Sequence, residues 1–164
     1  MNTVTCQSCN HHYEKSLLTC PFCGTPTLLK SGTGFEWKSA TEVLGFPFIH
    51  IAFGKDANGK RRIARGIIAI GQFGIGVICI AQIGIGLLFG FGQVMLGFSA
   101  IAQVAIAAYL GIGQLATGYI AIGQLAFGYY VLAQVGYGKF IWSTQFKDFE
   151  AVEFFKDLAH RIGF

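Results

Sequence analysis

The sequence predicts a mainly β chain built around a β-solenoid, with a metal-clamped head before it and an amphipathic helix after it. Residues 66–138, the charge-free block, contain 73 consecutive positions without Lys, Arg, Asp, Glu, His or Pro, and they repeat with a 21-residue unit. Two C-x-x-C pairs precede this block, and a segment with helical spacing follows it. The expected segments are a head at 1–30, a linker at 31–45, an entry β-hairpin at 46–65, a solenoid at 66–142 and a helix at 146–163.

The composition does not suit a water-soluble globule. Hydrophobic residues make up 53% of the chain and charged residues 12%, whereas about a quarter of residues are charged in soluble domains. Basic residues flank the charge-free block, at Lys55, Lys60, Arg61, Arg62, Arg65, Lys139 and Lys147. Such flanks are typical of a lipid-embedded segment with its basic side in the cytoplasm. A solvated basic loop is the alternative interpretation. The first 15 residues lack the apolar core of a signal peptide, so we expect the charge-free block itself to direct membrane entry.

The head carries the strongest local signal, which consists of the four cysteines Cys6, Cys9, Cys20 and Cys23. Each C-x-x-C pair can place two thiolates on one tight turn, and four thiolates fill a tetrahedral zinc site. Two disulfides are the alternative, which the absence of a secretion signal disfavours. Because a filled tetrahedron leaves no position for water, we predict a structural Zn²⁺ that supplies much of the folding energy of the head.

This spacing resembles the small zinc-ribbon domains at the ends of many bacterial proteins, and Cys20-Pro-Phe-Cys23-Gly24 matches their second turn. The resemblance covers residues 4–28 and implies a module for a protein partner rather than an activity. Reduced thiolates favour a cytoplasmic head. Lys15 and Lys30 are its cations, too few for a phosphate footprint, so no nucleic acid is expected. We expect His11 and His12 to be exposed.

The segment between the head and the charge-free block predicts a hairpin. Residues 31–34 have linker composition. The apolar run at 46–53 predicts a strand, Asn58-Gly59 supplies a turn with positive φ, and residues 62–70 would form the returning strand. His50 lies in the first strand without an evident acidic or cysteine partner, so a structural role is expected in preference to catalysis.

The repeat is marked by glutamine at alternating spacings of ten and eleven. In a 21-residue register, Gln72, Gln93, Gln114 and Gln134 share one column, and Gln82, Gln103 and Gln124 share another. A finer period of about five places a small residue, a variable residue and a large apolar residue in order. Coils stacked at about 4.8 Å pair every backbone group with a neighbouring coil, which lipid requires. We expect the two glutamine columns to form amide ladders.

The five-residue period resembles the pentapeptide-repeat family, whose right-handed quadrilateral β-helix turns a corner every five residues. The resemblance implies one coil for each 21-residue unit, with a small and a large residue pointing inward from each side. Here Gln, Tyr or an aliphatic residue replaces the usual Asp or Asn, and Ile or Phe takes the last outward position. These departures argue against a soluble, DNA-mimicking role.

An α-helical membrane protein with about three spans of roughly 20 residues is the alternative fold. The charge-free block contains no proline, charge or polar cluster for the two loops, and a period of five does not match 3.6 residues per turn. Three to four coils at about 4.8 Å would stack to less than the hydrocarbon thickness of about 30 Å. We therefore expect copies of the chain to self-associate.

The end of the chain predicts an amphipathic helix that caps the solenoid. Its apolar residues recur at helical spacing, at Phe146, Phe149, Val152, Phe155, Ala159 and Ile162. Mixed charges on the other face disfavour a position on the membrane surface.

These features favour a non-enzymatic protein whose partner is the lipid bilayer. No carboxylate lies between Asp56 and Asp148, which excludes an acid–base pair from the repeat. Cys79 occupies a column otherwise filled by alanine, as expected of a small buried residue. We expect a membrane-embedded or membrane-associated solenoid that self-associates, with the zinc ribbon and basic flank on the cytoplasmic side. The alternatives are a soluble homo-oligomeric scaffold that buries its apolar faces and a small helical membrane transporter or channel.

Overall fold

The computed structural model describes residues 3–6, 9–14, 17, 20–24, 34–56 and 59–163. The expectations for Lys15, Lys30, residues 31–33 and Asn58 fall outside these residues. The chain is mainly β with one C-terminal helix, as predicted. Its elements are β1 (Thr3–Thr5), β2 (His12–Glu14), β3 (Phe35–Lys38), β4 (Glu42–Val43), β5 (Phe46–Pro47), β6 (Ile49–Phe53), β7 (Ala64–Ser143) and α1 (Phe149–Ile162). No helix within the described residues is long and apolar enough to cross a membrane.

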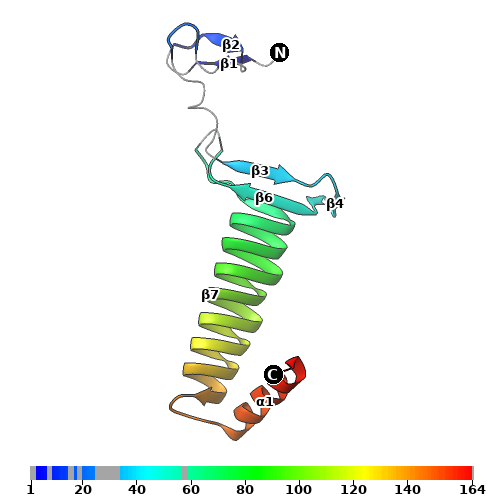
Figure 1. Cartoon of the computed structure of the whole chain (residues 1–164), viewed down its shortest axis with the longest axis vertical. Coiled ribbons are helices and arrows are strands. Elements are labelled where there is room, and N and C mark those ends of the chain that lie inside the picture. Colours follow the sequence, from blue (N-terminus) through cyan, green and yellow to red (C-terminus); the bar gives the residue numbers. More distant parts are fainter. Residues whose placement is uncertain are drawn as a thin grey trace.

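Strand β7 dominates the chain. Figure 1 shows it winding repeatedly about one axis, with β3 and β6 at one end and α1 at the other. The alternative of three helical spans in this block is therefore wrong. A Cβ atom added to Gly113 would clash with the carbonyl oxygen of Ala102, and one added to Gly123 would clash with that of Gly113. Glycine is needed at these two positions because the backbone of the preceding winding leaves no room for a side chain.

The two glycine contacts join residues that are eleven and ten positions apart in sequence, and aromatic rings along β7 contact one another at the same separations. Phe98 stacks on Tyr109 with ring centroids 5.4 Å apart, and the row continues through Tyr119 and Tyr129 at 6.2 and 5.0 Å. Neighbours in the row are again separated in sequence by ten or eleven positions. The expectation that equivalent positions of successive 21-residue units would be nearest neighbours is therefore wrong, because one stretch of β7 lies between them.

The glutamines also lie beside one another at separations of ten or eleven positions, and not only at 21. Gln72, Gln82 and Gln93 line one groove, although the 21-residue register assigned Gln82 to a different column from the other two. Thr144 continues the series, since its hydroxyl donates to the carbonyl oxygen of Gln134 at 2.9 Å. We conclude that the predicted separation into two glutamine columns is wrong for the three residues of the groove.

The interior along β7 holds mostly small side chains. The fully buried positions include Ala69, Cys79, Ala100, Ala105, Ala116, Ala121 and Ala126. Two larger buried side chains occupy space that a glycine leaves: Met95 Sδ lies 3.2 Å from a Cβ placed on Gly90, and Val131 Cγ1 lies 2.7 Å from one placed on Gly136. The resemblance to the pentapeptide-repeat family implied that each side points a large residue inward. That expectation is wrong, since most large residues of β7 face outward.

The exterior of β7 is apolar along much of its length. Leu87 is 69% exposed, Phe98 48% and Ile106 44%. Further exposed members are Ile75, Ile80, Ile83, Ile85, Leu88, Phe91, Val94, Leu96, Ile101, Tyr109, Tyr119, Phe127, Val135 and Tyr137. Monomeric soluble proteins rarely present so continuous an apolar surface to water.

The entry to β7 differs from the predicted hairpin. Strand β6 pairs with β7 in parallel, with Ile49 opposite Ile68, and pairs with β3 antiparallel on its other side. The hairpin prediction for 46–65 is wrong in its pairing, because β7 runs beside β6 in the same direction and not antiparallel to it. A small turn survives, with Gly59 at φ 76° and an antiparallel bridge between Lys55 and Arg61. The predicted linker at 31–45 contains β3 and β4.

Helix α1 packs on the other end of β7, and it begins at Phe149 rather than at the predicted position 146. Phe155 is buried at 5% exposure, and the ring of Phe154 stacks on Tyr130 with centroids 4.0 Å apart. The Asp148 carboxylate accepts a hydrogen bond from the backbone N–H of Ile141 at 2.9 Å. Gly163 ends the helix in the left-handed conformation, at φ 94°. The helix therefore covers the last part of β7.

Candidate metal centre

The two C-x-x-C segments adopt matching turns. The carbonyl oxygen of Cys6 accepts from the N–H of Asn10 at 2.9 Å, and that of Cys20 accepts from the N–H of Gly24 at 2.9 Å. Asn10 and Gly24 both have positive φ, 57° and 70°. Residues that tolerate this conformation therefore close each turn four positions after its first cysteine.

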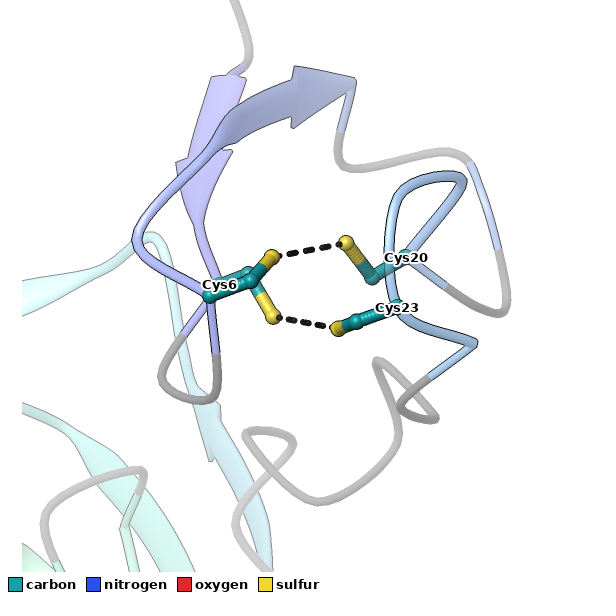
Figure 2. Close-up of side chains that lie close together, drawn as sticks. Cys6, Cys20 and Cys23 are labelled. Atoms are coloured by element: carbon teal, nitrogen blue, oxygen red, sulfur yellow. Dashed lines mark hydrogen bonds between the residues drawn. The ribbon is translucent and has the colours of Figure 1, made fainter.

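These turns bring four sulfur atoms together. The Sγ atoms of Cys6, Cys9, Cys20 and Cys23 all lie within 4.8 Å of one another. Two of these separations are 3.4 Å, between Cys6 and Cys23, and 3.6 Å, between Cys9 and Cys20, drawn as dashed lines in Figure 2. A disulfide needs about 2.05 Å, and none of the five cysteines of the chain forms a disulfide. The disulfide alternative is therefore not what the structure contains.

The sulfur positions fit a tetrahedral metal ion. Metal–sulfur bonds of about 2.3 Å give sulfur–sulfur edges of about 3.8 Å in a tetrahedron, close to the separations of 3.4 and 3.6 Å. Cys6 and Cys20 are buried, whereas Cys23 is exposed. The four predicted ligands are therefore close enough together to hold one ion.

Without a cation the thiols hinder one another's ionisation. A hydrogen bond from the His11 backbone lowers the pKa of Cys9, but desolvation and the thiols of Cys23, Cys6 and Cys20 raise it to about 12. A bound cation reverses this balance, because each thiolate then faces a positive charge. The cluster is thus suited to exchange thiol protons for a metal ion.

Neither neighbouring histidine belongs to the cluster. His11 and His12 are exposed, which matches the expectation. The His11 ring stacks on Phe22 with centroids 4.4 Å apart, and its Nδ1 lies 3.0 Å from the carbonyl oxygen of Cys9. This contact supports the first turn from outside.

A polar cluster that was not predicted lies where β3, β6 and β7 meet. His50 is buried at 4% exposure, and its Nδ1 accepts from the N–H of Arg65 at 2.8 Å. Its Nε2 therefore carries the proton and donates to Glu36 Oε1 at 3.2 Å. The expectation that His50 has no acidic partner is wrong, because the antiparallel pairing of β3 with β6 brings Glu36 beside it.

Glu36 also binds two cations. Lys38 Nζ lies 3.1 Å from its Oε1, and Arg62 donates to its Oε2. The hydrogen bond from Lys38 is the largest of several influences that hold the pKa of Glu36 below its usual value; the charge of Lys38, the His50 hydrogen bond and the charge of Arg62 add to it, and partial desolvation opposes it. The His50 contact ties β3 to β6, and the Arg62 contact ties β3 to the segment that leads into β7. Both contacts hold strands in place, which supports the predicted structural role of His50.

Cys79 is fully buried along β7, as expected of a small core residue. Its sulfur lies 2.6 Å from a Cβ placed on Gly74 and 2.5 Å from one placed on Gly84. The thiol therefore occupies space that these two glycines leave.

The comparisons give no relative from which an activity could be transferred. No protein-family model, no curated protein and no solved structure matches this chain.

Proposed function

We propose that the protein is a non-enzymatic membrane protein whose β7 strand forms a two-sided β-solenoid embedded in the bilayer. The contact spacing supports windings of ten or eleven positions, so that one unit of the sequence repeat covers two windings. Buried positions support two sides per winding, since Met95, Ala100 and Ala105 step by five, as do Ala116 and Ala121. The step from Ala105 to Ala116 is eleven positions, which corresponds to one of the longer windings.

The observation that carries the proposal is the match between this apolar solenoid and the thickness of a bilayer. At ten or eleven positions per winding, the 73 residues of the charge-free block form about seven windings, or about 34 Å at strand spacing. The hydrocarbon core is about 30 Å thick. The shortfall expected from 21-residue coils disappears, because twice as many windings stack along the axis. Parallel pairing between windings also satisfies the backbone without water.

The ends of the solenoid are suited to the two interfaces. Arg61, Arg62 and Arg65 precede the charge-free block and Lys139 follows it. Lys139 Nζ lies 3.2 Å from the hydroxyl of Tyr129, and Trp142 lies close behind in sequence. Cations and amphipathic rings of this kind favour the headgroup level. The narrow interior filled by alanine argues against an aqueous channel.

The head serves as an interaction module in this proposal. The four cysteines hold one structural Zn²⁺, which leaves no ligand position for catalysis. Reduced thiolates and the adjacent basic flank favour the cytoplasmic side. The head then presents its surface to a protein partner at the membrane. We still propose that copies of the chain self-associate, because their exposed apolar sides can pack against one another. A second copy is no longer needed to make the stack long enough to cross the bilayer.

A charge placed near the middle of the charge-free block tests the proposal. Ile106→Lys should destabilise a membrane-embedded chain by about 2–4 kcal/mol, as lysine does at the midplane of membrane proteins. Leu44→Lys is the matched control, since Leu44 is 91% exposed and lies outside the block. The wild-type chain and the control should stay in carbonate-washed membranes, and Ile106→Lys should reduce the retained amount.

Release of the wild-type chain by carbonate as a soluble oligomer would overturn membrane embedding. It would favour the scaffold alternative, in which copies cover one another's apolar sides.

A further inference from the structure

We infer that the groove at the basic end of β7 binds the headgroup of an anionic phospholipid. The groove has a volume of about 440 Å³ and lies beside the turn that leads into β7. Its lining includes the cations Lys55 and Arg61, the ring of Phe73 and the amides of Gln72, Gln82 and Gln93. This inference rests on the proposed function, which puts that end of β7 at headgroup level.

Two cations stand on one side of the groove. Lys55 and Arg61 face each other across an antiparallel bridge, which directs both side chains to the same face. Among the described residues, no carboxylate comes within 4.0 Å of either side chain, whereas the neighbouring Arg62 is paired with Glu36. Like charges directly opposite each other are unfavourable. A phosphate between them would relieve this repulsion.

The rest of the groove suits the remainder of a lipid. Arg61 lies over the Phe73 ring at 5.1 Å, a contact that keeps the guanidinium over the groove. The amides of Gln72, Gln82 and Gln93 succeed one another down β7 and can donate to ester and glycerol oxygens. Ile83 and the apolar exterior of β7 below them suit the acyl chains. A second copy of the chain fits this site less well, because it would bring its own Lys55 and Arg61 to the same end.

Thermal unfolding of the full zinc-loaded chain in neutral detergent micelles tests the site without requiring insertion into a bilayer. The probes are short-chain phosphatidylglycerol, phosphatidylcholine with the same acyl chains, and inorganic phosphate. Phosphatidylglycerol should raise the midpoint in a saturable manner, as a ligand of the folded state does. Phosphatidylcholine and inorganic phosphate should raise it far less.

Variants locate the response. Lys55→Gln with Arg61→Gln should weaken phosphatidylglycerol binding by about thirtyfold, since each cation near a lipid surface contributes about a factor of five. Exchange of the two cations, Lys55→Arg with Arg61→Lys, should keep the response because both positive charges remain. The unfolding transition of the double glutamine variant without lipid shows whether that variant is folded. Lys60→Gln is the matched control, because Lys60 lies in the same turn but does not line the groove.

Three results would overturn the inference: an equal response to phosphatidylcholine, an equal response to inorganic phosphate, or an unchanged response in the double glutamine variant. Carbonate extraction is unaffected by any of them, so failure of the lipid site and failure of membrane embedding are distinguishable.

Discussion

The substitution Gly74→Ala tests whether the two sides of each winding pack against each other across the interior. A Cβ at position 74 would lie 2.6 Å from Cys79 Sγ, while its next neighbours, Ala81 and Ala69, stay at 3.3 and 3.6 Å. Carbon and sulfur cannot approach so closely without displacement, so we expect a loss of about 1–3 kcal/mol from overpacking. For a chain of this size, the unfolding midpoint shifts by about 2–4 °C per kcal/mol.

Removal of the sulfur should reverse most of this loss. Cys79→Ala alone leaves a small cavity at a cost of about 1 kcal/mol. In the double variant the new methyl group fills that space, so we expect a coupling free energy of about 1–3 kcal/mol between positions 74 and 79. The assay is thermal unfolding in mild detergent, followed by far-UV circular dichroism, for wild type, both single variants and the double variant.

The matched control combines Cys79→Ala with Gly136→Ala, which meets Val131 Cγ1 at 2.7 Å, several windings away. These two losses should simply add, because distant sites do not couple. Additive losses at positions 74 and 79, or a harmless Gly74→Ala, would refute the packing described for the interior.

Three further predictions concern the parts attached to β7. The wild-type chain should bind one Zn²⁺ or Co²⁺, with the visible spectrum of tetrahedral thiolate-bound cobalt; Cys20→Ser should abolish that spectrum and Cys79→Ser should leave it unchanged. Because desolvation and the neighbouring thiols raise the pKa of Cys9 to about 12 without metal, metal must displace protons, and the apparent metal affinity should rise as pH rises toward that value. An affinity independent of pH would contradict this. Glu36→Ala should cost about 1–3 kcal/mol in urea unfolding because it leaves buried His50 Nε2–H without its acceptor, and Glu36→Gln should cost less because an amide oxygen still accepts. Since the folded-state pKa of Glu36 is lowered, wild type should be more stable to unfolding than Glu36→Gln at any pH above the unfolded-state pKa of about 4.3. This difference in stability should disappear as pH falls through the folded-state pKa of Glu36. A difference that persists in acid would speak against the ion pairs. Phe155→Ala should cost about 3–5 kcal/mol and expose α1 to protease, whereas Phe149→Ala, at an 80% exposed position, should change little; equal effects would mean that α1 does not pack as described.

The sequence carried enough information for the local features but left the winding length open. The cluster of four cysteines, the C-terminal helix and the five-residue period of small residues follow from spacing alone. A 21-residue repeat is compatible with a single long coil per unit or with two windings of ten and eleven positions. Only the neighbours across β7, such as Ala102 beside Gly113 and Phe98 on Tyr109, decide between these possibilities. The glutamine spacing of ten and eleven was the signal for the shorter winding.

The polar cluster was missed for a different reason. Glu36 and His50 are 14 residues apart in sequence and lie on strands whose pairing depends on where β3 begins. The segment containing Glu36 has too little apolar alternation to separate it from a linker. Nothing in the sequence alone indicates that β6 pairs antiparallel with β3 and parallel with β7, so the partner of His50 could not be deduced.

Depth measurement by spin labels in lipid vesicles tests the central claim most directly. Labels would replace the outward residues Leu88, Phe98, Tyr109 and Tyr119, one per protein, in a zinc-loaded chain carrying Cys79→Ala. If β7 is a solenoid across the bilayer, successive labels should differ in depth along the membrane normal by about 4.8 Å, with the deepest near the middle of the charge-free block. Steps of about 15 Å between labels would indicate helices at about 1.5 Å per residue. Equal, shallow depths at all four positions would contradict membrane embedding.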